Sequence, residues 1–104
     1  MHATEERLYE AEFHRLKGNL LLMHSLDNNT EAESCFHHAL AITRRQQAKS
    51  LELRAATSLS RLWQQQGKRQ EADDLLASVY GWFTEGFETP VLVEAKALLV
   101  ELED

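Results

Sequence analysis

The stretch ATSLSRLWQQQGKRQEADDLLASV (residues 56–79) decides the fold of this chain. Ala56, Leu59 and Trp63 recur at steps of three and four before Gly67, and Ala72 and other apolar residues recur at the same steps after it. This spacing is typical of amphipathic helices that turn one face to a core. Glycine permits the left-handed conformation that ends a helix. The stretch therefore predicts two antiparallel helices joined by a tight turn at Gly67.

Composition extends this prediction to the whole chain. Its 104 residues are enough for one domain, and 43% of them are hydrophobic and 27% charged. Four glycines and one proline, with abundant Ala, Leu, Glu, Gln and Arg, favour helix throughout. We expect a single all-α domain over residues 1–104.

The helices are expected over 4–23, 30–45, 51–66, 69–83 and 90–102, with a polar turn, SLDNN, at 25–29. Thr30 and Glu33 have the spacing of a capping box, Ser50 is the candidate cap of the third helix, and Thr89 with Pro90 begins the fifth. These elements form two helical hairpins, 4–46 and 50–83, and a C-terminal capping helix, 89–102.

The apolar positions predict which faces are buried. The first helix carries a broad apolar stripe that we expect to face the core: Leu8, Phe13, Leu16, Leu20 and Met23. Gly18 interrupts this helix at a cost of about 1 kcal/mol relative to Ala, so another helix is expected to cross closely there. The last helix is apolar on two sides: Val91, Ala95, Leu98, Leu99 and Leu102 on one, and Val93, Ala97 and Val100 on another.

The charge and the motifs argue against several function classes. A net charge of −6 without a basic stripe disfavours nucleic-acid binding. One cysteine cannot form an internal disulfide, and the sequence has neither a run of 18 apolar residues nor a signal-peptide core, so we expect a cytoplasmic protein that does not enter a membrane. No phosphate-binding loop, nucleophile elbow or HExxH motif is present. We therefore expect no enzyme activity and no cofactor.

Two residue pairs on the second helix could contact a metal, namely Glu33 with His37 and Cys35 with His38. A structural zinc needs four ligands, so the preferred interpretation is exposed polar residues beside Cys35, a small apolar filler. The aromatic residues near the end of the fourth helix are expected to pack between the last two helices rather than to stack on bases: Tyr80, Trp82, Phe83 and Phe87.

An internal repeat links the two hairpins. The pattern A-x3-F-x2-A at residues 32–39 matches A-x3-L-x2-V at residues 72–79, forty positions later. It resembles the second-helix pattern of the tetratricopeptide (TPR) repeat, and residues 56–67 are similar to the first-helix pattern and its glycine turn. Because the TPR repeat is about 34 residues long, longer helices are expected here. The resemblance implies a right-handed TPR-like solenoid of about five helices.

A narrower resemblance covers nearly the whole chain through AEFHRLKGNLLL (11–22) and EAESCFHHAL…VEAKALL (31–99). These segments resemble the C-terminal TPR-like region of large bacterial signalling proteins that carry an AAA-type ATPase module, often with a cyclase or transcription-regulator domain. The resemblance implies that the chain is a fragment of such a protein and that its last helix closes the array. It transfers no catalytic residue, since the catalytic motifs of those proteins lie in other domains.

In a TPR, the first helix of each hairpin lines a concave groove. The resemblance thus assigns Glu12, Arg15, Asn19 and Leu22 from the first helix, and Arg54, Thr57, Arg61, Gln64 and Gln65 from the third. Such a groove is locally basic, and its Arg and amide donors suit carboxylates. Some TPRs hold a peptide C-terminus with a Lys and an Asn at the places of Arg15 and Asn19.

The resulting hypothesis is a non-catalytic interaction module that binds a peptide, or another domain of its own polypeptide, in the groove. The alternative is a spacer or homodimerising unit that uses the last helix and the open helix edges. Two repeats are few for a stable solenoid, and pairing would compensate.

Overall fold

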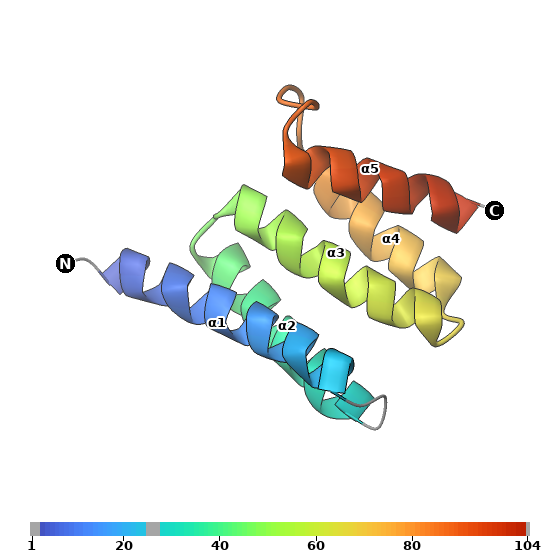
Figure 1. Ribbon diagram of the computed structural model, residues 1–104. Helices are drawn as coiled ribbons and strands as arrows, with labels where there is room; N and C mark the ends of the chain where they lie inside the picture. The colour runs from blue at the N-terminus through green and yellow to red at the C-terminus, as the bar shows by residue number, and fades with distance from the viewer. Residues whose placement is uncertain (1–2, 25–27, 104) are drawn as a thin grey trace.

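The computed structural model describes residues 3–24 and 28–103, which form α-helices and no strand (Figure 1). The all-α prediction is confirmed. The helices are α1 (Ala3–His24), α2 (Asn29–Arg45), α3 (Lys49–Gln65), α4 (Arg69–Tyr80) and α5 (Pro90–Glu103). The largest difference from the predicted ends is in α4, which stops before Phe83. The predicted turn at 25–29 falls mostly on residues 25–27, outside the described part. No helix among the described residues is long and apolar enough to cross a membrane.

Consecutive helices run antiparallel in two layers (Figure 1). In the front layer α1, α3 and α5 lie side by side, and α2 and α4 lie behind them. The central helix is α3, which contacts each of the other four. The extents of 44 × 36 × 19 Å agree with this arrangement, because two stacked helices are about 20 Å thick.

The core lies between the layers and is built by α2, α3, α4 and α5. The repeated positions are buried in both hairpins: Ala32, Phe36, Ala39, Ala72, Leu76 and Val79. The predicted core positions Leu53, Ala56, Leu59 and Leu62 of α3 are buried too, and Trp63, Leu75 and Phe83 are half-buried against the core. On α5, the buried side chains are Leu92, Ala95, Leu98 and Leu102. Val93, Ala97 and Val100 are exposed, so its second apolar side is free of contacts with the core.

The close crossing predicted at Gly18 is confirmed. A Cβ atom built on Gly18 would lie 2.6 Å from Cε1 of Phe36, closer than any van der Waals contact allows. Phe36 is itself fully buried. The aromatic ring therefore occupies the space that a side chain at position 18 would need, and the glycine lets α1 approach α2.

The expectation that the apolar stripe of α1 faces the core is wrong. Phe13, Leu16, Leu20 and Met23 are all exposed, and Leu8 is only half-buried. The fully buried residues of α1 are instead the small Ala11 and Gly18, and Leu21 and Leu22 are half-buried against the core. The physical reason is the close crossing: small residues permit contact with α2, and the stripe lies on the other side of the helix. Since α1 is at one end of the array, none of the described residues covers that side.

The turn after α2 and the turn after α3 have the same motif. After α3, Gly67 has φ +82°, its N–H donates to the Gln64 carbonyl, and the N–H of Lys68 donates to the Trp63 carbonyl. These are the two hydrogen bonds of a Schellman cap, and the predicted role of Gly67 is confirmed. After α2, Gln47 takes the left-handed conformation with φ +56°. A glutamine in that role explains why no glycine or proline marks this turn in the sequence.

The predicted N-caps of α2 and α3 are not observed, whereas α5 begins at Pro90 as predicted. α2 is preceded by Asn28, whose Nδ2 donates to the Leu21 carbonyl at 3.0 Å, and no side chain caps the helix, so the capping box of Thr30 and Glu33 is absent. α3 begins one residue before Ser50 and also lacks a side-chain cap. The start of α3 is fixed by the turn before it, because the Schellman cap of α2 leaves only residues 46–48 between the two helices.

Candidate functional site

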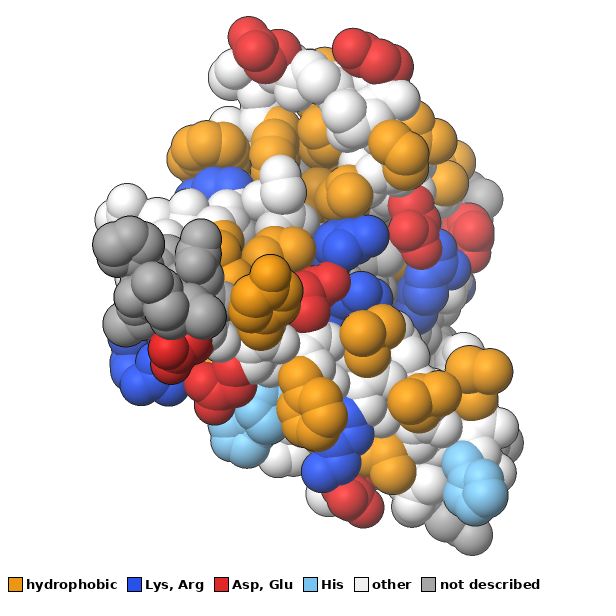
Figure 2. Space-filling model, turned by 60° about the vertical axis from the view of Figure 1, so that its left-hand side comes forward, with side chains coloured by type: hydrophobic (Ala, Val, Ile, Leu, Met, Phe, Trp, Pro, Cys, Tyr) orange, Lys and Arg blue, Asp and Glu red, His pale blue; other side chains and the backbone are white. Residues whose placement is uncertain are grey.

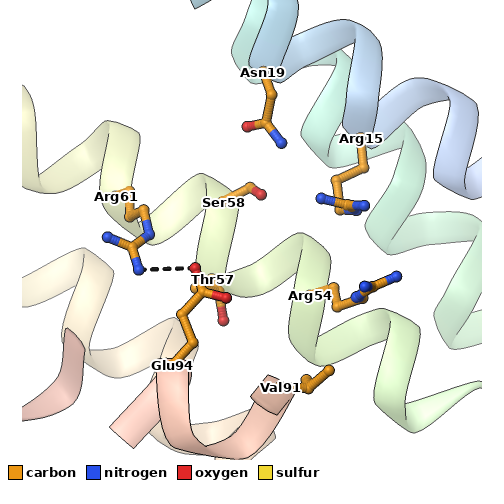
Figure 3. Close-up of a pocket in the computed structure, with 8 residues that line it drawn as sticks. All are labelled: Arg15, Asn19, Arg54, Thr57, Ser58, Arg61, Val91 and Glu94. Atoms are coloured by element: carbon orange, nitrogen blue, oxygen red, sulfur yellow. Dashed lines mark hydrogen bonds and ion pairs between the residues drawn. The ribbon is translucent and has the colours of Figure 1, made fainter. Parts of the chain in front are cut away.

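A cavity of about 300 Å³ opens between α1, α3 and α5 (Figure 3). We call it the front pocket. Its lining residues are Arg15, Asn19, Arg54, Thr57, Ser58, Arg61, Val91 and Glu94. Five of them are among the groove residues that the TPR resemblance assigned. α1 and α5 supply the walls, and α3, which lies between them in the same layer, forms the floor.

Helical spacing explains how α3 presents its part of the pocket. Thr57 and Ser58 are each three or four residues from both Arg54 and Arg61, so the four lie on one side of α3, the side that faces away from α2 and α4. The hydroxyl of Thr57 donates to the carbonyl of Leu53 at 2.8 Å, so its proton is already used. The polar groups that remain directed into the pocket are the two guanidinium groups and the Ser58 hydroxyl.

Glu12 connects α1 to α3 at the edge of the pocket. Its carboxylate accepts two hydrogen bonds from Arg15, from Nε and Nη2 at 3.0 Å each, and a third from Nη1 of Arg54 at 2.9 Å. Burial raises the pKa of Glu12, but the hydrogen bonds and charges of the two arginines lower it more, so the pKa lies below the usual 4.5. Glu12 is therefore ionised at neutral pH and holds both guanidinium groups in place.

Arg61 connects α3 to α5 on the other side of the pocket. Its Nη2 donates to Oε2 of Glu94 at 2.9 Å, the contact drawn in Figure 3. Both side chains are about half-exposed, at 45% and 58%. An exposed pair of this kind contributes at most about 1 kcal/mol, and a ligand carboxylate can replace Glu94 at little cost.

The charge around the pocket is less basic than predicted. Three arginines line it, and Glu12 and Glu94 are bound to them, which leaves one net positive charge. The chain as a whole carries −6, so the pocket is still a locally positive region on an acidic protein.

Three of the assigned groove residues lie elsewhere. Leu22 is half-buried against the core. Gln64 donates from Nε2 to Oε1 of Glu101 at 3.2 Å, and Gln65 is exposed and outside the pocket lining.

Sequence reasoning missed Ser58, Val91 and Glu94 as pocket residues. Ser58 could have been found, because it lies between Thr57 and Arg61 on the same helix face. Val91 and Glu94 could not, since no pattern in the sequence shows that α5 lies beside α3.

The other candidate sites do not assemble. A shallow hollow of about 420 Å³ on α2 is lined by Thr30, Glu33, Ser34, His37 and His38, with His37 Nε2 3.4 Å from Glu33 Oε2. Among the described residues, no three metal-binding side chains come close enough to hold an ion. Cys35 is buried beside Phe36, as predicted.

The aromatic residues at the end of α4 and just after it differ in how far they are buried. Tyr80 and Phe83 are half-buried and pack against the core, with the rings of Tyr80 and Phe87 5.8 Å apart. Trp82 is 59% exposed, and Lys49 lies 5.5 Å from its ring. The expected packing between α4 and α5 therefore holds for part of the group only.

No protein-family model matches the chain. Neither the curated proteins nor the solved structures include a match to it.

Proposed function

We propose that the chain is a non-catalytic, TPR-like interaction module that binds a carboxylate of a peptide, or of another domain of its own polypeptide, in the front pocket. The observation that carries the proposal is the convergence of Arg15, Arg54 and Arg61 on one cavity. Two of these arginines come from α3 and one from α1, so their meeting depends on the fold.

The donors in the pocket are only partly used. A guanidinium group has five N–H donors. Within the described residues, Arg15 uses two of them on Glu12, Arg54 uses one on Glu12 and Arg61 uses one on Glu94. The remaining donors can bind a ligand carboxylate in the bidentate manner that arginine favours. The flanking Asn19 amide can bind the adjacent peptide group.

The size of the pocket limits the ligand. A volume of about 300 Å³ is at the lower end for ligand sites, enough for one or two residues. The ligand is therefore a C-terminal carboxylate or an acidic side chain, with a small apolar group against Val91. A longer peptide would continue along the front layer outside the cavity.

The TPR-like assignment has separate support. Positions that repeat in the sequence, such as Phe36 and Leu76, are fully buried in both hairpins. The glycine turn forms as a TPR-like hairpin requires. We further propose that this module belongs to a larger bacterial signalling ATPase, which would supply the partner domain.

Paired peptide arrays test the pocket. One array carries peptides with a free C-terminus, and its counterpart carries the same peptides as amides; binding is then quantified by fluorescence anisotropy. We expect carboxylate-dependent binding that falls at least tenfold in R54E/R61E. A matched control is K68E/K96E, which makes the same charge change at exposed positions outside the pocket.

Three results would contradict this proposal. Equal losses of binding in both double variants would mean a general effect of charge. Binding of the amidated peptides with equal affinity would exclude recognition of the carboxylate. An array without any bound peptide would overturn the proposal of peptide binding. Circular dichroism checks that R54E/R61E is folded.

A second proposal is self-association as a structural unit. It is favoured by the apolar residues exposed at both ends of the array, on α1 and on the outer side of α5.

A further inference from the structure

The exposed face of α1 carries five large apolar side chains, which we call the α1 stripe. Their exposed fractions are 75% for Tyr9, 61% for Phe13, 50% for Leu16, 64% for Leu20 and 82% for Met23. Figure 2 shows hydrophobic side chains in a broken row across the lower part of this face. Monomeric proteins rarely leave an apolar patch of this size uncovered, so the stripe calls for a partner.

The spacing within the stripe indicates that the partner is a helix. From Tyr9 to Met23 the steps are four, three, four and three, which is the a/d pattern of a coiled coil. A pattern with this period of 3.5 keeps its side chains along one seam between two helices. The small residues Ala11 and Gly18, which pack toward α2, are both at f positions, opposite the seam.

The exposed area is large enough for a weak to moderate interface. Free apolar side chains of this size present about 200 Å² each, so the stripe exposes roughly 600–700 Å² per copy. A standard interface uses about 800 Å² per partner, and flanking polar residues would supply the difference.

The charges beside the stripe fit a second copy of the same helix. Glu10 and Lys17 are seven residues apart on one flank, both at e positions. In an antiparallel pair with Phe13 opposite Leu16 of the second copy, Tyr9 lies opposite Leu20. In the same register Glu10 lies beside Lys17 of the other copy, twice by symmetry.

A parallel pair fits less well. It would place Lys17 beside Glu12 of the second copy, whose carboxylate already holds two arginines at the front pocket. Lys17 forms no ion pair with the described residues, whereas Glu10 is paired there with its helix neighbours, the exposed Arg7 at 3.1 Å and the half-buried His14 at 3.9 Å. The e-position charges are thus available for the antiparallel arrangement.

We propose that two copies of this chain associate through an antiparallel, two-fold symmetric pairing of their α1 stripes. The inference rests on the proposal of self-association, and the interface reaches only the edge of the front pocket, through Glu12 and Asn19 on the other flank of the stripe. It assigns the interface to α1 and leaves the outer side of α5 free.

Sedimentation velocity over about a hundredfold range of concentration tests the interface. The unmodified chain should pass from monomer to dimer and not beyond. L16E places a charge at the centre of the seam and should weaken association at least tenfold, while V93E, at an equally exposed valine of α5, should leave it unchanged. Circular dichroism of both variants shows whether they are folded.

A charge swap tests the register. K17E places a glutamate beside Glu10 of the other copy, twice by symmetry, and should weaken association several-fold. E10K/K17E exchanges the two charges and should restore the association. E10K alone should also weaken the antiparallel pair, because it opposes Lys17, whereas in a parallel pair positions 10 and 17 do not meet and the two substitutions would act independently. Failure of the double variant to recover would overturn the antiparallel arrangement.

The remaining outcomes distinguish the proposals. A strict monomer at all concentrations would overturn both this inference and self-association in general, without affecting the peptide test. A dimer that V93E disrupts and L16E does not would overturn the assignment to α1 alone. A molar mass that increases beyond that of the dimer would indicate head-to-tail pairing of α1 with α5. It would likewise overturn the symmetric pairing of α1 with α1.

Discussion

Replacing Gly18 by alanine should destabilise the protein, although the same change in the middle of an ordinary helix stabilises it. The gain in helix propensity is about 1 kcal/mol. Against it stands the contact with Phe36, whose Cε1, Cζ and Cδ1 atoms would lie 2.6, 2.9 and 3.0 Å from the new Cβ. Overpacking of a buried site costs about 1–3 kcal/mol. Because Phe36 is completely buried and cannot swing into solvent, the clash should win by about 1 kcal/mol.

Urea unfolding followed by the circular dichroism of the helices measures this difference in unfolding free energy. For a domain of this size, 1 kcal/mol also corresponds to a fall of about 4–8 °C in the thermal midpoint. The two measurements should agree in sign, since the helices are reporters of the same cooperative transition.

A second substitution separates the clash from other effects. F36L removes the two ring atoms closest to position 18, so G18A in that background should be neutral or stabilising by up to about 1 kcal/mol. The coupling between the two substitutions is then at least about 1 kcal/mol. If G18A raised the stability of the unmodified protein, or if its cost were the same with and without Phe36, the close crossing of α1 over α2 would be refuted.

Three further predictions concern the turns and the ion pairs. E52Q should lower the free energy of unfolding, measured with urea, by about 1–2 kcal/mol. The reason is that Glu52 is only 4% exposed and its carboxylate pairs with Arg44 at 3.2 Å and with Lys49 at 3.3 Å. An unchanged urea midpoint would contradict this prediction. Glu12 has a folded pKa below 4.5, so its contribution to stability is present above that pH and is lost as the pH falls through the folded pKa. The thermal midpoint of E12Q should therefore depend less on acid pH than that of the unmodified protein, and parallel curves would count against the ion pairs. G67A should lower the free energy of unfolding by about 1 kcal/mol. The loss comes from the φ of +82° alone, because no atom lies within 4 Å of a Cβ built at this position. G67N should lower it by less, since asparagine tolerates the left-handed conformation better.

The sequence was sufficient to predict most of the fold because the hairpins are locally encoded. Ala32, Phe36 and Ala39, and their counterparts forty residues later, are buried as the helical spacing predicts. The exceptions are at helix starts. At Thr30 and Ser50 a side-chain cap is a small contribution, about 1 kcal/mol, and tight turns can move a helix start by one residue without it.

The candidate site was predictable only in part, because it is assembled from different helices. Arg54 and Arg61 were placed correctly on one face, since both belong to α3. Glu94 was missed, because its contact with Arg61 spans 33 residues and depends on the packing of α5. Helical periodicity describes one helix at a time and carries no information about which helix will be its neighbour.

The error on α1 has a different cause, and it bears on function. Periodicity identifies the most apolar face of a helix, and on α1 that face runs from Tyr9 to Met23. A helix can instead use its smallest residues for the intramolecular contact, as α1 does at Ala11 and Gly18, because a glycine leaves room for a large ring such as that of Phe36 to approach closely. The large apolar residues then remain exposed to water, and the isolated chain loses the free energy that their burial would contribute. A seam with coiled-coil spacing and self-complementary charges offsets that cost when two copies meet, which is why the face that misled the core prediction is the one we assign to association.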